Sequence, residues 1–326
     1  MNDVKLYFWK VVTKVLPLFD FLLLPFTFLA SLWFLVIRKA GIEQAYFSKK
    51  IFLSVGVFPI RDHYYEPLFN AAHIRRENGD RYLPGINLNV EKQLQLLSSF
   101  NYAAELSLIP IDKKSDIKYY YNNPSFFAGD SEYLYNIIRL KKPRKIIEVG
   151  SGFSTLMMLE AIEKNRSENK DYDCKVICIE PYEMPWLEKT GVHVVRKMVQ
   201  EIDRELFKEL KEGDILFIDS SHIIRPGGDV LFEYLEILPT LNRGVIIHIH
   251  DIFTPRDYPF ENYEKYIVFI NEQYLVEAFL TLNKDFEILA AVNFLKRNYL
   301  EALQQKCPII SIKKDREPRS LWIVRL

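Results

Sequence analysis

Short apolar runs rich in isoleucine and valine recur through the second half of the chain, and segments with helical spacing separate them. The runs are "KIIEV", "KVICIE", "VHVV", "DILFID" and "GVIIHIHD". Segments such as "STLMMLEAIEKN" and "GDVLFEYLEILPTL" lie between them. This alternation predicts a parallel sheet covered by helices on both faces. Two late runs, "FEILAAV" and "SLWIVRL", lack a full crossover helix between them and predict an antiparallel edge.

The N-terminal part has a different pattern. Residues 15–37 are apolar except for Asp20, and this length is enough to cross a hydrocarbon core of about 30 Å. The run is longer than the core of a signal peptide, and no small-residue cleavage site follows it. Pro17 and Pro25 would kink a spanning helix, but they also suit a segment that dips into one leaflet and returns.

Basic residues flank the apolar run on both sides, so their distribution does not orient it. They are Lys5, Lys10 and Lys14 before the run and Arg38, Lys39, Lys49 and Lys50 after it. We predict membrane association through residues 15–37, with the remainder of the chain in the cytoplasm. A buried hairpin of a soluble domain is the alternative, and a spanning or re-entrant topology stays open.

These patterns divide the chain into three predicted parts. Residues 1–45 form a hydrophobic membrane-associated segment, 46–129 a helical or irregular cap extension, and 130–326 the ligand-binding domain. The predicted fold class is α/β, with a Rossmann-like, doubly wound and mostly parallel sheet that has an antiparallel edge strand. An asparagine cap at Asn89 and an aspartate cap at Asp130 predict helices that begin at these two positions.

Composition narrows the possible ligands. Lysine plus arginine equals aspartate plus glutamate at 43 each, which argues against a nucleic-acid partner. Cys174 and Cys178 flank a predicted strand, and with Cys307 they make three cysteines. Free buried thiols in a reducing compartment are therefore expected.

Polar residues follow four of the predicted strands at their carboxyl ends. In open α/β sheets, ligands bind beyond these ends. The residues are Glu148 to Gly152, Glu180, Asp219 to His222, and His248 to Asp251. Stability alone does not explain polar residues at the ends of four separate apolar strands.

The glycine-rich turn "EVGSGFST" favours a cationic ligand over a dinucleotide. Gly150 and Gly152 allow a tight strand-to-helix turn, but Thr155 stands where a dinucleotide fingerprint has its last glycine. Glu148 would repel a pyrophosphate, whereas S-adenosylmethionine carries an ammonium and a sulfonium. Glu180, at the end of the next strand, could accept both ribose hydroxyls of either ligand.

The motifs "IIEVGSGFST", "CIEPY", "DILFIDSSH" and "GVIIHIHDIF", in this order, resemble class I S-adenosylmethionine-dependent methyltransferases. The likeness is to the bacterial methyltransferase-domain subgroup with the "HIHDIF" motif, and it reaches from about residue 50 to the end of the chain. The resemblance implies that Glu148, Gly150 and Gly152 hold the methionine part of S-adenosylmethionine and Glu180 its ribose. Ser151, Ser154 and Asp219 complete the implied cofactor site, with the adenine near Met198 to Gln200.

Two arrangements are open for the acceptor side. Asp219, His250 and Asp251 could bind a divalent metal such as Mg²⁺, which would activate a hydroxyl. The related metal-dependent O-methyltransferases usually have an aspartate where this chain has His250. Alternatively, a histidine acts as general base, because its pKa lies near neutrality. The predicted catalytic residues are His222, His250 and Asp251; one of His248 and His250 is expected to be structural.

The predicted activity is O-methylation of a hydroxyl on a sugar, glycan or other small acceptor. Tyrosines at Tyr64, Tyr65 and Tyr119 to Tyr121 either line that acceptor or pack in the core. The alternatives are hydroxylase-like chemistry on the same fold, an NAD-dependent oxidoreductase, and a membrane-tethered protein that binds without catalysis. The acceptor and the oligomeric state stay open.

Overall fold

The computed structural model describes residues 12, 15–40, 42–56, 79–182, 184–266, 268–313 and 316–326, without the side chains of Arg38, Lys39 and Glu43. Some predicted features lie outside these residues, namely Lys5, Lys10, Lys14, Tyr64 and Tyr65. The chain divides into two compact units, Met1–Arg76 with Phe260–Phe269, and Glu77–Pro259 with Ile270–Leu326. The predicted divisions after residues 45 and 129 stay predictions.

The N-terminal unit contains the apolar run. Its elements are α2 (Leu24–Ala40), η1 (Ile42–Gln44) and α3 (Tyr46–Val55). Within the described residues no single helix is long and apolar enough to cross a bilayer. The stretches Val15–Leu22 and Leu24–Ile37 reach the required length and hydropathy together, but the chain bends by 72° between them.

The larger unit is built on a mixed sheet of seven strands in the order β3-β2-β1-β4-β5-β7-β6. The pairs among β1 to β5 are parallel, whereas β7 is antiparallel to both β5 and β6. The predicted Rossmann-like fold with an antiparallel edge is confirmed. The strands are β1 (Lys145–Val149), β2 (Lys175–Ile179), β3 (His193–Val195), β4 (Ile215–Ile218), β5 (Ile246–Ile249), β6 (Phe286–Ala291) and β7 (Leu321–Arg325).

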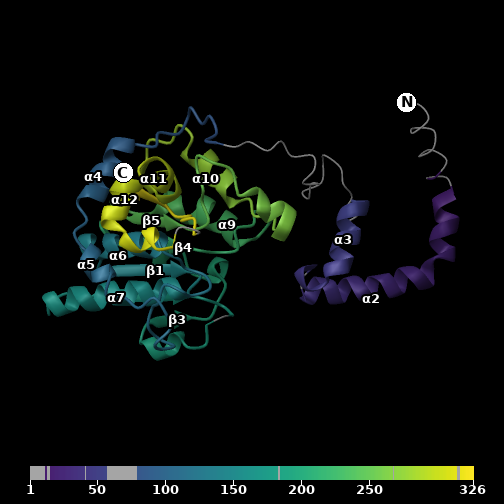
Figure 1. The fold of residues 1–326 in the computed structure, drawn as a ribbon, viewed down its shortest axis with the longest axis horizontal. Coiled ribbons are helices and arrows are strands. Elements are labelled where there is room, and N and C mark those ends of the chain that lie inside the picture. The colour runs from purple at the N-terminus through teal and green to yellow at the C-terminus, as the bar shows by residue number, and fades with distance from the viewer. Residues whose placement is uncertain are drawn as a thin grey trace. The chain divides into compact units, whose positions relative to one another are not determined.

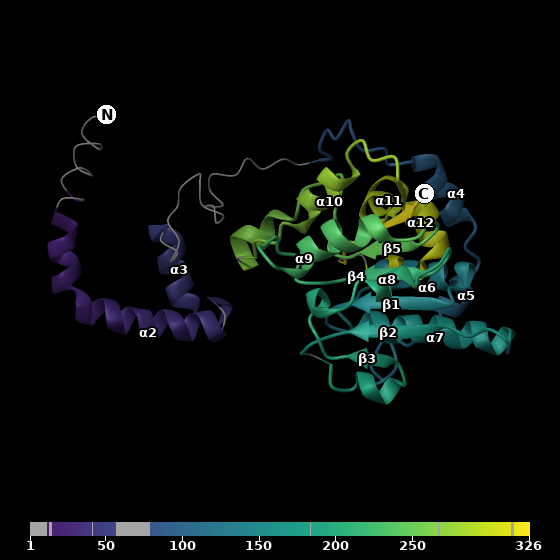
Figure 2. The ribbon, with the colours of Figure 1, turned by 180° about the vertical axis from the view of Figure 1, so that it is seen from behind.

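Helices cover both faces of this sheet (Figures 1 and 2). They are α4 (Val90–Ser98), α5 (Ala103–Leu106), α6 (Asp130–Lys141), α7 (Phe153–Glu168), α8 (Glu205–Lys208), α9 (Asp229–Phe232), α10 (Glu272–Leu280), α11 (Val292–Asn298) and α12 (Leu300–Lys306). Short 3-10 or π turns lie at Leu187–Thr190, Val199–Glu201, Glu233–Ile237, Leu238–Thr240, Asn262–Tyr266 and Pro308–Ser311.

Alternation along the strands produces two separate cores. On one face, Ile146 and Phe217 pack with side chains of α6 and α7. On the other face, Ile147 and Leu216 pack with side chains of α8, α9 and α10. Because successive side chains of a strand point to opposite faces, one polar residue can face a core while its neighbour faces elsewhere.

Residues between 79 and 129 pack against the sheet domain, within the same compact unit. The amide N–H of Ala291 in β6 donates to Oε1 of Gln93 in α4 at 2.9 Å. Tyr119 and Tyr121 are buried, and their hydroxyls donate to the carbonyls of Phe126 and Leu106. These two tyrosines therefore pack in the core and do not line an acceptor site.

Asp130 does not cap α6 as predicted. The N-cap residue is Gly129, and the buried Asp130 carboxylate accepts hydrogen bonds from the backbone amides of Arg319 and Ser320. The side chain thereby ties the start of α6 to the segment that leads into β7.

Candidate functional site

Gly150 lets the carboxyl ends of β1 and β4 approach each other closely. Its φ is +75°, and a Cβ atom at this position would lie 1.8 Å from the carbonyl oxygen of Asp219. The Gly150 amide donates to the carbonyl of Ile179, and the Asp219 amide donates to the carbonyl of Val149. The turn thus joins the ends of β1, β2 and β4.

Gly152 is under a much weaker constraint. Its φ of −178° is extended backbone that any residue adopts, and an added Cβ would meet only Met184 Cε, at 3.7 Å. Its amide donates to Thr155 Oγ1 at 3.1 Å, at the start of α7. Of the two glycines in the motif, only Gly150 is required by the backbone.

The Glu148 side chain, in β1, is fully buried and faces the first turn of α7. Ser154 Oγ donates to one carboxylate oxygen at 2.6 Å and Thr155 Oγ1 to the other at 2.5 Å, with Cys178 Sγ at 3.3 Å. Burial raises the pKa of Glu148 from 4.5 to about 7, against the opposing effect of the two hydroxyls.

The prediction that Glu148 faces a cationic ligand is therefore wrong in its geometry. The carboxylate points into the core face of the sheet, and Ser154 is turned toward it as its hydrogen-bond donor. Strand alternation explains the error, because the ligand side at this position belongs to the next residue, Val149.

A cavity of about 350 Å³ lies beyond the carboxyl ends of β1, β2 and β4. It contains Glu180 and Asp219 from the predicted cofactor site, and the predicted adenine region from Met198 to Gln200. Its lining consists of Val149, Gly150, Ile179, Glu180, Pro181, Tyr182, Met198, Val199, Gln200, Asp219, Ser220, Ser221, Arg225 and Asp229.

Glu180 is held rigidly at the edge of this cavity. Its carboxylate oxygens accept the backbone amides of Ser151 at 3.2 Å and Tyr182 at 3.0 Å. Two buried polar atoms nearby, Ser151 Oγ and Gln200 Oε1, have no hydrogen-bond partner among the described residues.

His222 joins three carboxylates beside the cavity. Its Nδ1 lies 2.7 Å from Glu272 Oε2, and its Nε2 lies 3.1 Å from Asp219 Oδ1 and 3.5 Å from Asp251 Oδ2. Both His222 and Asp251 have positive φ, 59° and 55°. Such backbone is uncommon outside glycine and often occurs at functional sites, where the surrounding structure holds it.

The surroundings of His222 and Asp251 favour the charged form of each side chain. Burial alone would lower the pKa of His222, but hydrogen bonds to Asp219 and Glu272 outweigh burial and hold that pKa well above its ordinary value. Burial likewise opposes ionisation of Asp251, yet the positive charges around it lower its pKa to about 2. A protonated imidazole cannot accept a proton, so the predicted role of His222 as general base does not fit this state.

The predicted metal ligands are not assembled into one site. Asp251 accepts a hydrogen bond from Arg319 at 2.9 Å, while the His250 ring packs against Phe126 at 5.4 Å between ring centroids. Among the described residues, no three His, Cys, Asp or Glu side chains are arranged to hold a metal. The rings of His248 and His250 lie 5.5 Å apart, and His248 stacks on Phe217 at 3.9 Å between ring centroids.

Two residues of the cluster around His222, Glu272 and Arg319, were not predicted from the sequence. Glu272 begins α10, is fully buried and also accepts the Tyr234 hydroxyl at 2.8 Å. Arg319 precedes β7. Neither lies at the carboxyl end of a parallel strand, and each is distant in sequence from its partner, so no local motif indicates them.

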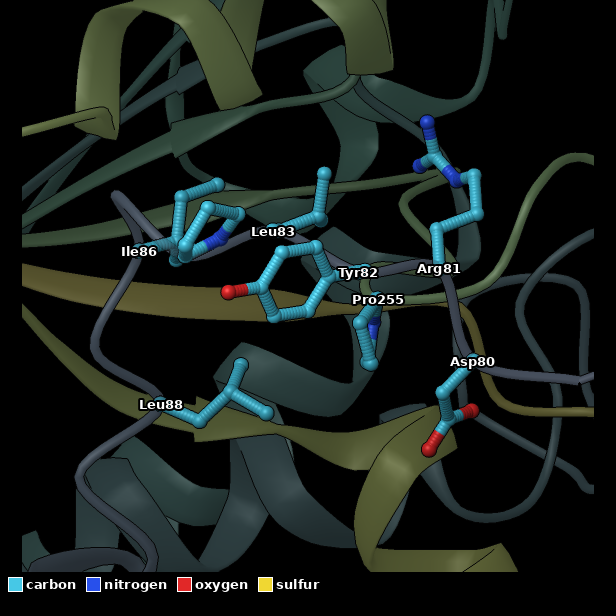
Figure 3. A pocket seen from close by; sticks show the side chains of 8 residues that line it. Asp80, Arg81, Tyr82, Leu83, Ile86, Leu88 and Pro255 are labelled. Atoms are coloured by element: carbon cyan, nitrogen blue, oxygen red, sulfur yellow. The ribbon is translucent and has the colours of Figure 1, made fainter.

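A second cavity of about 220 Å³ lies on the segment that precedes α4 (Figure 3). Tyr82, which is 89% exposed, stands in this cavity among Leu83, Ile86 and Leu88. The Arg81 amide donates to the carbonyl of Pro255, in the loop after β5, at 3.0 Å.

Residues 147–252 match a family model described as "Methyltransferase domain". The matched stretch covers about a third of the chain. The matched range begins in β1 and ends just after Asp251, so it includes the glycine turn, Glu180 and the ends of β4 and β5. An uncharacterized protein of Archaeoglobus fulgidus is 28% identical over 173 residues, which cover 49% of this chain and 76% of that protein.

Solved structures with low similarity include two O-methyltransferases. One, from Bacillus cereus in complex with SAH, is 12% identical and covers 72% of this chain and 91% of its own, with a TM-score of 0.34. The other, TomG from Streptomyces achromogenes in complex with SAM, is 14% identical and covers 71% and 89%, with a TM-score of 0.36.

The two glycines of the turn after β1 should respond differently to alanine. Gly150→Ala introduces a methyl group against the Asp219 carbonyl and a residue with φ of +75°, so we expect a loss of more than about 2 kcal/mol in the free energy of unfolding. Gly152→Ala is the matched control and should lose less than about 1 kcal/mol. Urea unfolding measures both, and equal losses would contradict the assignment.

Burial of Glu148 predicts a pH dependence of stability. The folded-state pKa of about 7 lies above the unfolded value, so the folded state binds the proton more tightly, and the stability this provides below pH 4.5 is lost as pH rises to 7. Glu148→Gln removes this dependence. Relative to that variant, wild type should lose on the order of 3 kcal/mol of unfolding free energy between pH 4.5 and pH 8. Urea unfolding measures the unfolding free energy of both proteins at each pH. If the two curves of free energy against pH run parallel, the raised pKa of Glu148 is contradicted.

Proposed function

We propose that the chain is an S-adenosylmethionine-dependent methyltransferase that acts on an oxygen atom. The observation that carries the proposal is the cavity at the ends of β1, β2 and β4, within the stretch that matches the methyltransferase-domain model, with the Glu180 carboxylate at its edge. Its position beyond the carboxyl ends of parallel strands is where such folds bind ligands.

The residues around the cavity fit the nucleoside part of this cofactor. Glu180 places a carboxylate at the edge of the cavity, and a carboxylate at the end of this strand can accept both hydroxyls of a ribose. Gln200 Oε1, which has no hydrogen-bond partner in the described part of the chain, could accept from an adenine amino group. A buried acceptor without a partner is costly unless a ligand or water satisfies it. The bare backbone at Gly150 permits close approach of the ligand.

Bound S-adenosylmethionine would supply a methyl group activated by its sulfonium charge. The acceptor hydroxyl would donate a hydrogen bond to Asp219, which lines the cavity, and Asp219 would take up the proton as the oxygen is methylated. The His222 imidazolium fixes the orientation of that carboxylate from 3.1 Å. Glu272 in turn holds His222 from 2.7 Å and acts as a positioning residue.

We also propose a sugar, glycan or other small hydroxyl compound as the acceptor. The cavity around Tyr82 supports this, because it combines an exposed aromatic ring with the charged side chains of Asp80 and Arg81. The loop after β5 connects this cavity to the cluster around His222. Pro255 of the loop lines the cavity. Gln273, which follows Glu272 in α10, accepts the Phe253 amide and donates to the carbonyl of Arg256 in the same loop.

Calorimetric titration with S-adenosylmethionine tests the cofactor site. Glu180→Gln keeps the side-chain shape but removes the charge, and we expect a loss of affinity of roughly tenfold to a hundredfold, the worth of charge-assisted hydrogen bonds. Glu148→Gln is the matched control, because its carboxylate faces the core, and should bind almost as wild type does. Unchanged binding in Glu180→Gln, or tighter binding of NADH than of S-adenosylmethionine, would reject the proposal.

The kind of acceptor atom is tested with cofactor that carries a labelled methyl group. Membrane and small-molecule extracts of the producing cells serve as acceptor pools. Because a methyl ether resists mild alkali and a methyl ester does not, label on a hydroxyl acceptor should survive alkaline treatment. Release of the label as methanol would show a carboxylate acceptor instead, while binding of the cofactor would stand.

A further inference from the structure

The described residues of the N-terminal unit expose a large apolar surface. Most apolar side chains between Val15 and Val55 are exposed, and α3 has no buried residue. Phe26 and Phe28 are 70% and 65% exposed on α2, and Phe47 is 79% exposed on α3. Soluble monomers rarely expose contiguous apolar patches larger than several hundred Å², so this surface needs an apolar environment.

The backbone of this unit is bent at a defined place. Pro25 lacks an N–H group and sits in the first turn of α2, and the bend of 72° lies between Leu22 and Leu24. Straight, the two stretches would be long enough for a hydrocarbon core of about 30 Å. Bent, the 17 residues of α2 alone reach about 25 Å at 1.5 Å per residue, which is too short to cross.

α3 folds back onto α2 within the unit. Trp33 Nε1 donates to Ser48 Oγ at 3.2 Å, and the rings of Phe34 and Phe52 lie 5.3 Å apart. The hydroxyl of Ser31, a polar group of α2, donates to the carbonyl of Thr27 at 2.7 Å, which satisfies it without water. Both helices are thus joined into one hairpin that can stay intact in lipid.

We propose that residues 15–55 form a re-entrant hairpin that enters and leaves a lipid bilayer through the same leaflet. The charges support this topology. A spanning segment would normally carry its basic residues on one flank, whereas lysines stand on both flanks here, three before residue 15 and Lys49 and Lys50 after residue 40. A re-entrant hairpin places both flanks at the cytoplasmic surface, where the basic residues of each flank are close to anionic lipid. This inference does not depend on the proposed methyl transfer.

The three native cysteines are buried, so single introduced cysteines report topology cleanly. We would place one at Val12, one at Gln44 and one at the exposed Lys170 of the larger unit, in the full-length chain. A membrane-impermeant maleimide should label all three in inverted vesicles and none in intact spheroplasts. Labelling of Val12→Cys in spheroplasts would show a spanning segment and overturn the proposal, as would release of the wild-type protein from membranes by an alkaline carbonate wash.

Pro25 provides a second, independent test. Pro25→Leu restores the missing N–H and should straighten the segment, so that Val12→Cys becomes reactive in spheroplasts while Lys170→Cys stays protected. Pro17→Leu, in the first turn of the preceding helical stretch, is the matched control and should leave the labelling unchanged. If Pro25→Leu keeps both flanks on one side, the assignment of the turn to this proline is wrong.

Discussion

The backbone contact between Gly150 and Asp219 is the constraint around which the site is organised. A side chain at Gly150 would collide with the Asp219 carbonyl, so the ends of β1 and β4 can meet only with glycine at that position. Hydrogen bonds from Gly150 to Ile179 and from Asp219 to Val149 bind the three strand ends together. Glu180 and Asp219 consequently line one cavity, although they lie 39 positions apart in the sequence.

Buried carboxylates perform three different tasks near these strand ends, and their surroundings decide which. Glu148 meets two hydroxyls in a core and stabilises the start of α7. Glu180 accepts two backbone amides and lines the cavity. Glu272 meets an imidazole and a phenol, and holds His222 in its charged form against the cost of burial. The residue type alone would not separate these roles.

The apolar runs predicted all seven strands and their parallel or antiparallel directions, because burial on both faces leaves an unmistakable pattern in the sequence. The ends of the strands were predicted less well. A shift of one position turns a side chain to the opposite face, which is why Glu148 was placed in the ligand site and Val149 was not. His250 and Asp251 illustrate the same difficulty, since positive φ at Asp251 redirects the chain just beyond β5. Glu272 and Arg319 reach the cluster only through tertiary folding, which no spacing rule describes.

The central claim is that the cavity bounded by Glu180, Gln200 and Asp219 holds the nucleoside of a methyl donor, while Glu148 only supports the sheet. The most direct measurement is a crystal structure of the full chain with S-adenosylhomocysteine. The account predicts ribose hydroxyls against the Glu180 carboxylate, the adenine beside Gln200, and Glu148 still bonded to Ser154 and Thr155. A ligand located elsewhere, or a Glu148 carboxylate turned out of the core to contact it, would contradict the account.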